Sequence, residues 1–191
     1  MFRNILVLML LVPFMASAQD EKAKTKPQFV TSGGIALLIG QSEPAPQWQV
    51  VNGLKFNNNW FVGAGAGMDY YRFRSVPIFL SVKKEGLFKK PLFAYVDGGV
   101  ALPAATEAEK AQSSFFSKFY TGFYSELGLG WSIKATRKTS YLLSLGYSIR
   151  TMKDKATMPS FSSFWPSPDT EMTTNYTFHV INFRISMNLD W

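Results

Sequence analysis

The sequence predicts an all-β protein whose eight antiparallel strands close into an up-and-down barrel. Three observations support this fold class. Apolar and polar residues alternate along most of the chain, turn-type residues separate the alternating segments, and short and long connections follow a regular order. No segment of ten or more residues after the first eighteen has convincing helical periodicity. One domain is expected for a chain of 191 residues.

Residues 1–18 have the pattern of a secretory signal peptide. Arg3 precedes an apolar run, and an Ala-Ser-Ala cleavage site ends at Ala18. The run is shorter than the roughly 20 residues that a helix needs to cross a bilayer. We therefore expect export and cleavage, with residues 19–28 forming a periplasmic N-terminal tether and residues 29–191 forming the barrel domain.

The composition excludes several classes of protein. The chain has no cysteine, which excludes a disulfide scaffold, a thiolate metal site and a lipid-anchored cysteine. No later stretch approaches 18 consecutive apolar residues, which excludes a helical membrane protein. Aromatic residues nevertheless make up 16% of the chain. Apolar side chains must therefore be distributed by alternation.

The first four strands are expected at 29–40, 47–56, 60–71 and 76–82. The first two alternate weakly but are bounded by Gly, Pro and Asn. The third sets Val62, Ala64, Ala66 and Met68 against alternating glycines. Those glycines do not form a nucleotide-binding loop, because they lie within a strand and no helix follows. We interpret them as room for bulky neighbours such as Tyr95 and Tyr124.

The last four strands are expected at 92–100, 122–133, 141–150 and 181–191. The final strand has the clearest pattern, because it alternates without a break over eleven residues. The connections 57–59, 84–90 and 134–138 are short. The connections 103–118 and 152–175 are long and fall at the other end of an up-and-down barrel.

The polar face of the strands indicates which side meets lipid. A water-facing surface carries about 25 to 35% charged residues, whereas this face is mostly Gly, Ser, Asn and Tyr, with Asp97, Glu126 and Arg184 near mid-strand. Such residues suit the narrow lumen of an eight-stranded barrel. The apolar face is therefore predicted to contact lipid, and aromatic residues near strand ends are predicted to lie at the membrane interface: Trp60, Trp131, Tyr141, Tyr147 and Trp191.

Residues 29–191 resemble a small outer-membrane β-barrel protein of the OmpA/OmpX-like type. The resemblance rests on the segment 57–71 and on a last strand that ends in an aromatic residue and carries Phe183, Ile185, Met187, Leu189 and Trp191. It implies a multi-pass barrel in the outer membrane, surrounded by outer-membrane lipids. It also implies that the last strand is the signal read by the outer-membrane insertion machinery. Most such families end in Phe, so Trp191 is a departure.

Charged residues on the polar face are predicted to form an ion network in the lumen. Asp97, Glu126 and Arg184 are expected at mid-barrel depth, with Asp69 and Arg150 near the extracellular rim. We interpret the network as a plug of paired charges, because an unpaired buried charge is costly. A narrow ion path is the alternative.

His179 is the only histidine and is predicted on the lipid face. Some outer-membrane barrels are lipid A-modifying enzymes with a His-Ser-acid site on that face, but no Ser lies two residues from His179. Thr177 is the nearest hydroxyl on that face. We therefore predict no catalytic, cofactor-binding or metal-binding residues.

The remaining predictions concern partners. Basic residues gather in the short turns, where they suit anionic headgroups of the inner leaflet or are simply solvated. The connections 103–118 and 152–175 could bind an extracellular partner, or 152–175 could collapse as a lid over the barrel. Nucleic acid is not an expected partner of an exported chain.

The leading hypothesis is a non-enzymatic outer-membrane barrel with a structural or surface-interaction role. Its alternatives are a lipid A-modifying enzyme, a narrow pore and a soluble carrier of an apolar ligand.

Overall fold

The computed structural model describes residues 26–104, 117–158 and 170–191. The predicted signal peptide and most of the predicted tether lie outside these residues, as do 105–116 and 159–169 within the two long connections. The described residues form nine strands. Their bounds are β1 Gln28–Ile39, β2 Ala45–Lys55, β3 Trp60–Asp69, β4 Ser75–Leu87, β5 Leu92–Pro103, β6 Ser117–Tyr120, β7 Gly122–Lys134, β8 Thr139–Met158 and β9 Thr170–Asp190.

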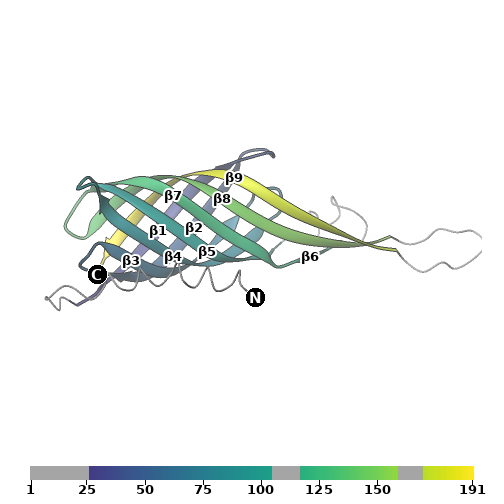
Figure 1. Cartoon of the computed structure of the whole chain (residues 1–191), viewed down its shortest axis with the longest axis horizontal. Helices are drawn as coiled ribbons and strands as arrows, with labels where there is room; N and C mark the ends of the chain where they lie inside the picture. The colour runs from purple at the N-terminus through teal and green to yellow at the C-terminus, as the bar shows by residue number, and fades with distance from the viewer. Residues whose placement is uncertain (1–25, 105–116, 159–169) are drawn as a thin grey trace, which may run out of the picture.

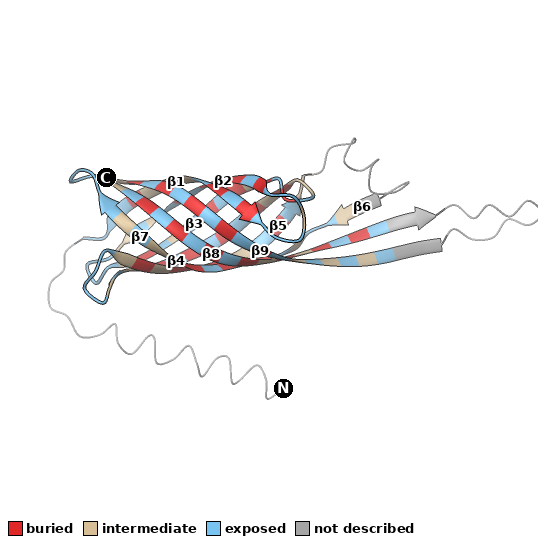
Figure 2. Ribbon diagram, turned by 90° about the horizontal axis from the view of Figure 1, so that it is seen from above, coloured by how far each residue is buried: buried red, intermediate tan, exposed pale blue. Residues whose placement is uncertain are grey.

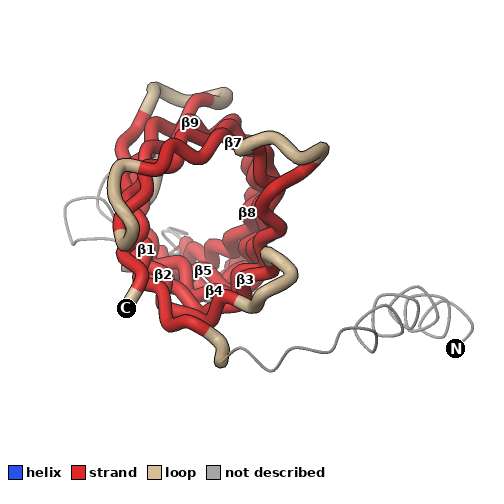
Figure 3. Tube along the Cα trace, turned by 90° about the vertical axis from the view of Figure 1, so that its left-hand side faces the viewer, coloured by secondary structure: helices blue, strands red, loops and turns tan. Residues whose placement is uncertain are grey.

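The nine strands make an eight-stranded closed barrel, because β6 and β7 are two parts of one interrupted strand. Both pair with β8. Tyr120 lies opposite Lys153 and Tyr124 opposite Arg150, so the interruption is a one-residue bulge. Strand β9 pairs with both β8 and β1, which closes the ring seen in Figure 3. All pairings are antiparallel, and the predicted up-and-down barrel is confirmed.

The strands are staggered by ten residues around the ring. Successive paired positions, followed from Asp190, return to the same strand at Val180; they are Asp190, Val30, Gly53, Gly63, Ser81, Asp97, Glu126, Ser148 and Val180. Strand number and stagger together set the tilt and the width of a barrel. Eight strands leave an interior that side chains can fill.

Alternate residues along each strand point into and out of the barrel, which gives the checkered burial pattern of Figure 2. The inward face contains three buried apolar clusters, which include Tyr124, Tyr71 and Phe93 respectively. The outward face is apolar and exposed: Ile35, Leu80, Leu129 and Leu145 are each more than half exposed. The prediction that the apolar face points outward is thus confirmed.

The tight turns lie at one end of the barrel with Trp191, and both long connections lie at the other end (Figure 1). We call these the turn end and the loop end. The β4–β5 turn has consecutive residues in the left-handed region, Phe88 at φ 54° and Lys89 at φ 57°. Before it, Gly86 has φ 72° and occupies a register shift between β4 and β5. No described helix is long and apolar enough to cross a membrane.

Several predicted boundaries were wrong. The sequence interpretation treated 152–175 as a loop, but β8 continues to Met158 and β9 starts at Thr170, so the pair projects beyond the barrel (Figure 1). Likewise, β4 continues to Leu87, which shortens the expected turn at 84–90. The reason is the same in both places. Backbone pairing continues past the membrane, where outward positions such as Lys153 are polar and the apolar alternation ends.

Candidate functional site in the barrel lumen

The carboxylate of Glu126 accepts most of the hydrogen bonds in the middle of the lumen. Glu126 on β7 is 2% exposed and accepts four hydrogen bonds. Its Oε1 accepts from the Tyr95 hydroxyl at 2.8 Å and from Arg184. Its Oε2 accepts from the Tyr124 hydroxyl and from Asn182 Nδ2, both at 2.9 Å. These donors compensate for the removal of a carboxylate from water.

Arg184 on β9 is the cationic partner in this cluster. It forms a salt bridge with Glu126, and its Nη1 lies 3.8 Å from Asp97 Oδ2. The guanidinium also lies over the Tyr95 ring, 5.3 Å from its centroid. With the Gln49 amide oriented to satisfy both of its atoms, Gln49 accepts from Arg184 Nη1 at 2.9 Å. The structure therefore brings together the three predicted mid-lumen residues, Asp97, Glu126 and Arg184.

The cluster crosses the full width of the barrel. Asn182 Nδ2 donates to Glu126 on β7 and to Gln47 Oε1 on β2, the latter at 3.1 Å. Three strands separate β2 from β7 in either direction around the ring, so these two strands are opposite each other. The chain of hydrogen bonds thus spans the lumen at mid-depth. We call Gln47, Tyr95, Asp97, Tyr124, Glu126, Asn182 and Arg184 the lumen network.

The sequence interpretation missed four members of this network: Gln47, Tyr95, Tyr124 and Asn182. All four share the inward strand parity of the predicted charges, and this parity was the available signal. It does not show which inward residues meet, because that depends on the stagger around the ring.

Glycines make room for the network, although not those that the sequence interpretation selected. A Cβ at Gly65 would lie 2.7 Å from the Phe79 ring, and a Cβ at Gly63 would lie 2.8 Å from the Phe61 ring. Tyr95 instead lies over Gly128 and Gly146 on β7 and β8. The prediction that the β3 glycines accommodate Tyr95 and Tyr124 was therefore wrong, because stagger brings other strands beneath these rings.

A small cavity lies beside the lumen network. It has a volume of about 30 Å³, and Lys83, Phe93, Ser144 and Arg184 are among its lining residues. This volume has room for about two water molecules. The Lys83 ammonium lies 4.9 Å from the Phe61 ring centroid and 5.5 Å from that of Phe93. These rings, together with Glu85 and Asp97 nearby, partly offset the burial of this cation.

A second ion pair lies nearer the loop end of the lumen. Arg150 on β8 forms a salt bridge with Asp69 on β3, and both side chains are buried. Arg150 Nε donates to Ser148 Oγ at 3.1 Å. Its guanidinium lies 5.3 Å from the Tyr124 ring centroid, and the Tyr124 hydroxyl donates to Glu126, so Tyr124 contacts both charged clusters. The other two predicted lumen residues are thus paired with each other.

The short β3–β4 connection covers the mouth of the barrel. Tyr71 is buried against Leu38 and Val180, and its hydroxyl accepts from the Ser42 backbone N–H at 2.8 Å. Phe73 packs against Phe119 of β6 and Tyr176 of β9, with ring centroids 4.8 and 5.9 Å apart. Because β4 and β9 are opposite each other in the ring, these contacts cross the opening.

The sequence interpretation assigned a possible lid to 152–175, yet the described ends of that segment project away from the barrel (Figure 1). The lid in the described structure is the aromatic and arginine-rich connection at 70–74.

The predicted interface aromatics lie on the outer wall. Trp60, Trp131, Tyr141 and Trp191 are at the turn end, whereas Tyr147 is nearer the loop end. The predicted insertion-signal residues Phe183, Ile185, Met187, Leu189 and Trp191 all lie on the outward face of β9 or directly after it, on the strand that closes the barrel.

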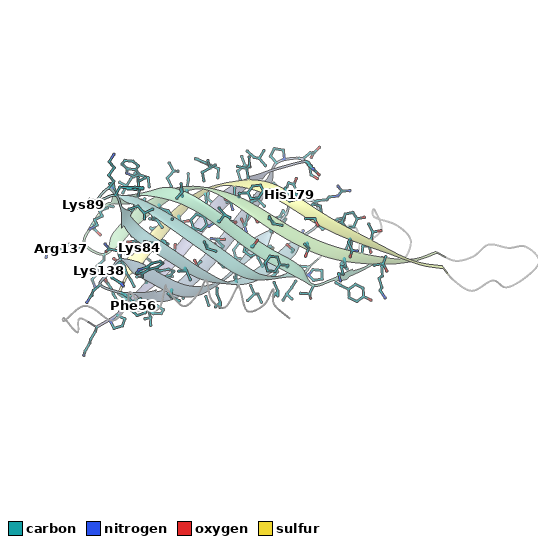
Figure 4. All side chains as sticks on the ribbon, in the orientation of Figure 1. Phe56, Lys84, Lys89, Arg137, Lys138 and His179 are labelled. Carbon is teal, nitrogen blue, oxygen red and sulfur yellow. The ribbon has the colours of Figure 1, made fainter. Side chains whose placement is uncertain are left out.

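His179 lies on the outer wall, far from the turn end (Figure 4). Its Nδ1 is 2.6 Å from the Tyr147 hydroxyl, and the two rings stack with centroids 6.0 Å apart. No serine contact to this ring is recorded among the described side chains, and no described group of three His, Asp or Glu residues could hold a metal ion.

A closed barrel with an apolar outer band and a polar, charged interior is the architecture of outer-membrane proteins. The chain is therefore an integral outer-membrane β-barrel of the small eight-stranded class. Short turns face the periplasm in this class, so the turn end is periplasmic and the loop end extracellular. A soluble carrier would have the opposite polarity, and that alternative is wrong.

Two solved structures have the same fold. The outer membrane protein OprG from Pseudomonas aeruginosa is similar over 90% of this chain and 99% of its own, with 14% identity and a TM-score of 0.54. The outer membrane protein AlkL is similar over 91% of this chain and 96% of its own, with 10% identity and a TM-score of 0.52. No protein-family model and no curated protein sequence matches the chain.

Proposed function

We propose that this protein is a non-enzymatic, non-conducting barrel that anchors extracellular segments in the outer membrane. The observation that carries the proposal is the hydrogen-bonded path from Gln47 through Asn182 to Glu126, which joins opposite walls of the lumen. An ion path would have to break these bonds. Because the interior is of low dielectric, each broken contact would leave a buried polar group unsatisfied.

The surface-interaction role is supported by the projecting strands. Strands β8 and β9 stay paired from the barrel out to Met158 and Thr170. Beyond the membrane this ribbon is polar, with Lys153 and Asn175 exposed. The described ends of this paired ribbon project beyond the barrel (Figure 1). The partner would therefore meet the segment 152–175 and its neighbour 103–118 above the lipid headgroups.

Replacement of Arg184 tests the plug. Arg184→Ala leaves Glu126 and Asp97 buried without their cation, and breaking a buried pair in this way costs about 3 to 5 kcal/mol. We expect a lower temperature for the heat-induced gel shift, while both proteins remain silent in planar bilayers.

The matched control for this test is Ser144→Ala. This inward residue lies opposite Arg184 on β8. Among the described side chains, it makes no hydrogen bond to the lumen network. It should melt as the parent protein does. Steady conductance of the parent, or an Arg184→Ala barrel that conducts and melts normally, would contradict the plug.

The His179 site tests the non-enzymatic part of the proposal. Its ring is hydrogen-bonded to Tyr147 rather than to a serine nucleophile, and a hydrolytic site needs a nucleophile within reach of its base. We expect cells carrying His179→Ala to have the same lipid A mass spectrum as cells with the parent protein. A changed acylation pattern that Tyr147→Phe also produces would support the lipid A-modifying alternative.

A further inference from the structure

The periplasmic end carries an exposed concentration of positive charge. Lys89 and Lys90 are exposed in the β4–β5 turn, and Lys134, Arg137 and Lys138 are exposed at the β7–β8 turn. Figure 4 shows Lys89, Arg137 and Lys138 at this end of the barrel, together with Lys84. The acid nearest in sequence, Glu85, points inward and pairs with Lys55. The exposed cations are therefore not neutralised by that carboxylate.

The two turns are neighbours in space. Strand β5 pairs with β4 on one side and with β7 on the other, so the turns flank the same strand. The Ser132 backbone N–H donates to Pro91 O at 2.7 Å, and Leu92 pairs with Trp131. The five cations thus form one edge, which we call the basic rim: Lys89, Lys90, Lys134, Arg137 and Lys138.

The basic rim continues directly into the lipid-facing belt. Trp131 and Ile133 point outward from the end of β7 and are 46% and 55% exposed. Across β5 from β7, the Lys84 ammonium on β4 lies 5.0 Å from the Trp60 ring centroid on β3. From the apolar belt towards the turn end, aromatic rings are followed by basic side chains. This order is typical of the membrane interface, where acyl chains meet the lipid headgroups.

Phe88 is a further sign that the rim contacts lipid. It is 86% exposed at the tip of the β4–β5 turn and has a φ of 54°. A bulky residue is disfavoured in this left-handed conformation, where hairpin turns prefer Asn-Gly. With so much of the ring exposed, packing within the barrel does not account for it. A membrane interface does, because it buries an aromatic ring that the barrel leaves exposed.

We propose that the basic rim binds the phosphate groups of anionic phospholipids in the periplasmic leaflet, with Phe88 and Trp131 contacting the same lipids. The chemistry is phosphate recognition by clustered Lys and Arg beside an apolar wall. Lipid fits better than peptidoglycan or an acidic protein, because the cations begin where the apolar belt ends. A partner in the aqueous periplasm would not need that continuity.

Native mass spectrometry of the detergent-solubilised full barrel can test this proposal, with titration of phosphatidylglycerol and of zwitterionic phosphatidylethanolamine. We expect the parent protein to prefer phosphatidylglycerol. Lys89→Gln/Lys90→Gln and Arg137→Gln/Lys138→Gln should each weaken that binding at least threefold, and the fourfold variant should weaken it at least tenfold. Binding of phosphatidylethanolamine should not change. A gel of unboiled samples verifies that each variant is folded.

The matched control removes two exposed cations from the extracellular end, Arg72→Gln/Lys153→Gln, and should leave phosphatidylglycerol binding unchanged. Equal loss in this control would mean that overall charge, rather than the rim, attracts the lipid. Parental affinity in the folded fourfold variant would overturn the proposal. So would rim-dependent binding to isolated peptidoglycan without any preference between the two lipids.

Discussion

At the scale of single residues, Tyr95 depends on the absence of side chains on neighbouring strands. Its ring lies over Gly128 and Gly146, and its hydroxyl donates to Glu126. A Cβ at Gly128 would lie 2.7 Å from that hydroxyl, and one at Gly146 would come closer still. Interior positions in this barrel are therefore matched in pairs, large against small, as in other closely packed cores.

This matching predicts that Gly146→Ala lowers the free energy of unfolding by about 1 to 3 kcal/mol, the usual cost of overpacking. Tyr95→Phe removes the nearest atom, so the double variant should lose less stability than the sum of the two single variants. Urea titration in lipid vesicles measures the three differences.

Gly33→Ala is the control for this cycle, because a Cβ there would meet open space. It should be close to neutral. Strict additivity of Gly146→Ala and Tyr95→Phe would show that Tyr95 does not occupy the space above Gly146.

At the scale of elements, the β4–β5 turn combines poor turn residues with a regular hairpin. Lys90 N–H donates to Leu87 O at 2.9 Å across the two left-handed residues Phe88 and Lys89. Asn and Gly adopt this conformation with less strain. We expect Phe88→Asn/Lys89→Gly to raise the free energy of unfolding by about 1 kcal/mol.

The same double substitution should weaken phosphatidylglycerol binding, since it removes one rim cation and the exposed ring. Stability from urea titration and affinity from mass spectrometry are then expected to change in opposite directions. A loss of stability would contradict the expected relief of turn strain.

At the scale of the whole molecule, the outer wall is one apolar belt, and its tolerance of charged substitutions depends on their depth in the bilayer. Leu127 and Ile133 both point outward from β7 and are similarly exposed, at 59% and 55%. Leu127 lies beside the mid-lumen Glu126, whereas Ile133 is next to the last residue of the strand. Charged substitutions on the lipid face cost about 2 to 4 kcal/mol at the midplane and about 0 to 1 near the interface.

Leu127→Arg should therefore make folding into vesicles less favourable by about 2 to 4 kcal/mol. Ile133→Arg should make it less favourable by about 1 kcal/mol or less. Both variants carry the same new charge, so the comparison isolates depth. Equal costs would mean that the bilayer does not lie where the apolar belt places it.

Much of this architecture follows from local pattern. The period of two separates inward from outward residues on every strand, and it did so correctly for the final strand from Ile181 to Trp191. Strand boundaries were less predictable where the alternation of apolar and polar residues ends but the strand continues. Beyond Arg150 the outward positions become polar, so the sequence resembles a loop although the backbone stays paired to Met158.

The sequence by itself determined the number of barrel strands, the lipid-facing side and the charged residues that point inward. The number follows from the count of alternating segments, and the two faces follow from alternation together with the small, weakly charged residues of the polar face. Only the tertiary structure decided which inward residues meet. Asn182 joins Gln47 to Glu126 because ring closure with a stagger of ten residues brings β9 between these two walls. That stagger is a property of all eight strands together, so no single strand's sequence records it.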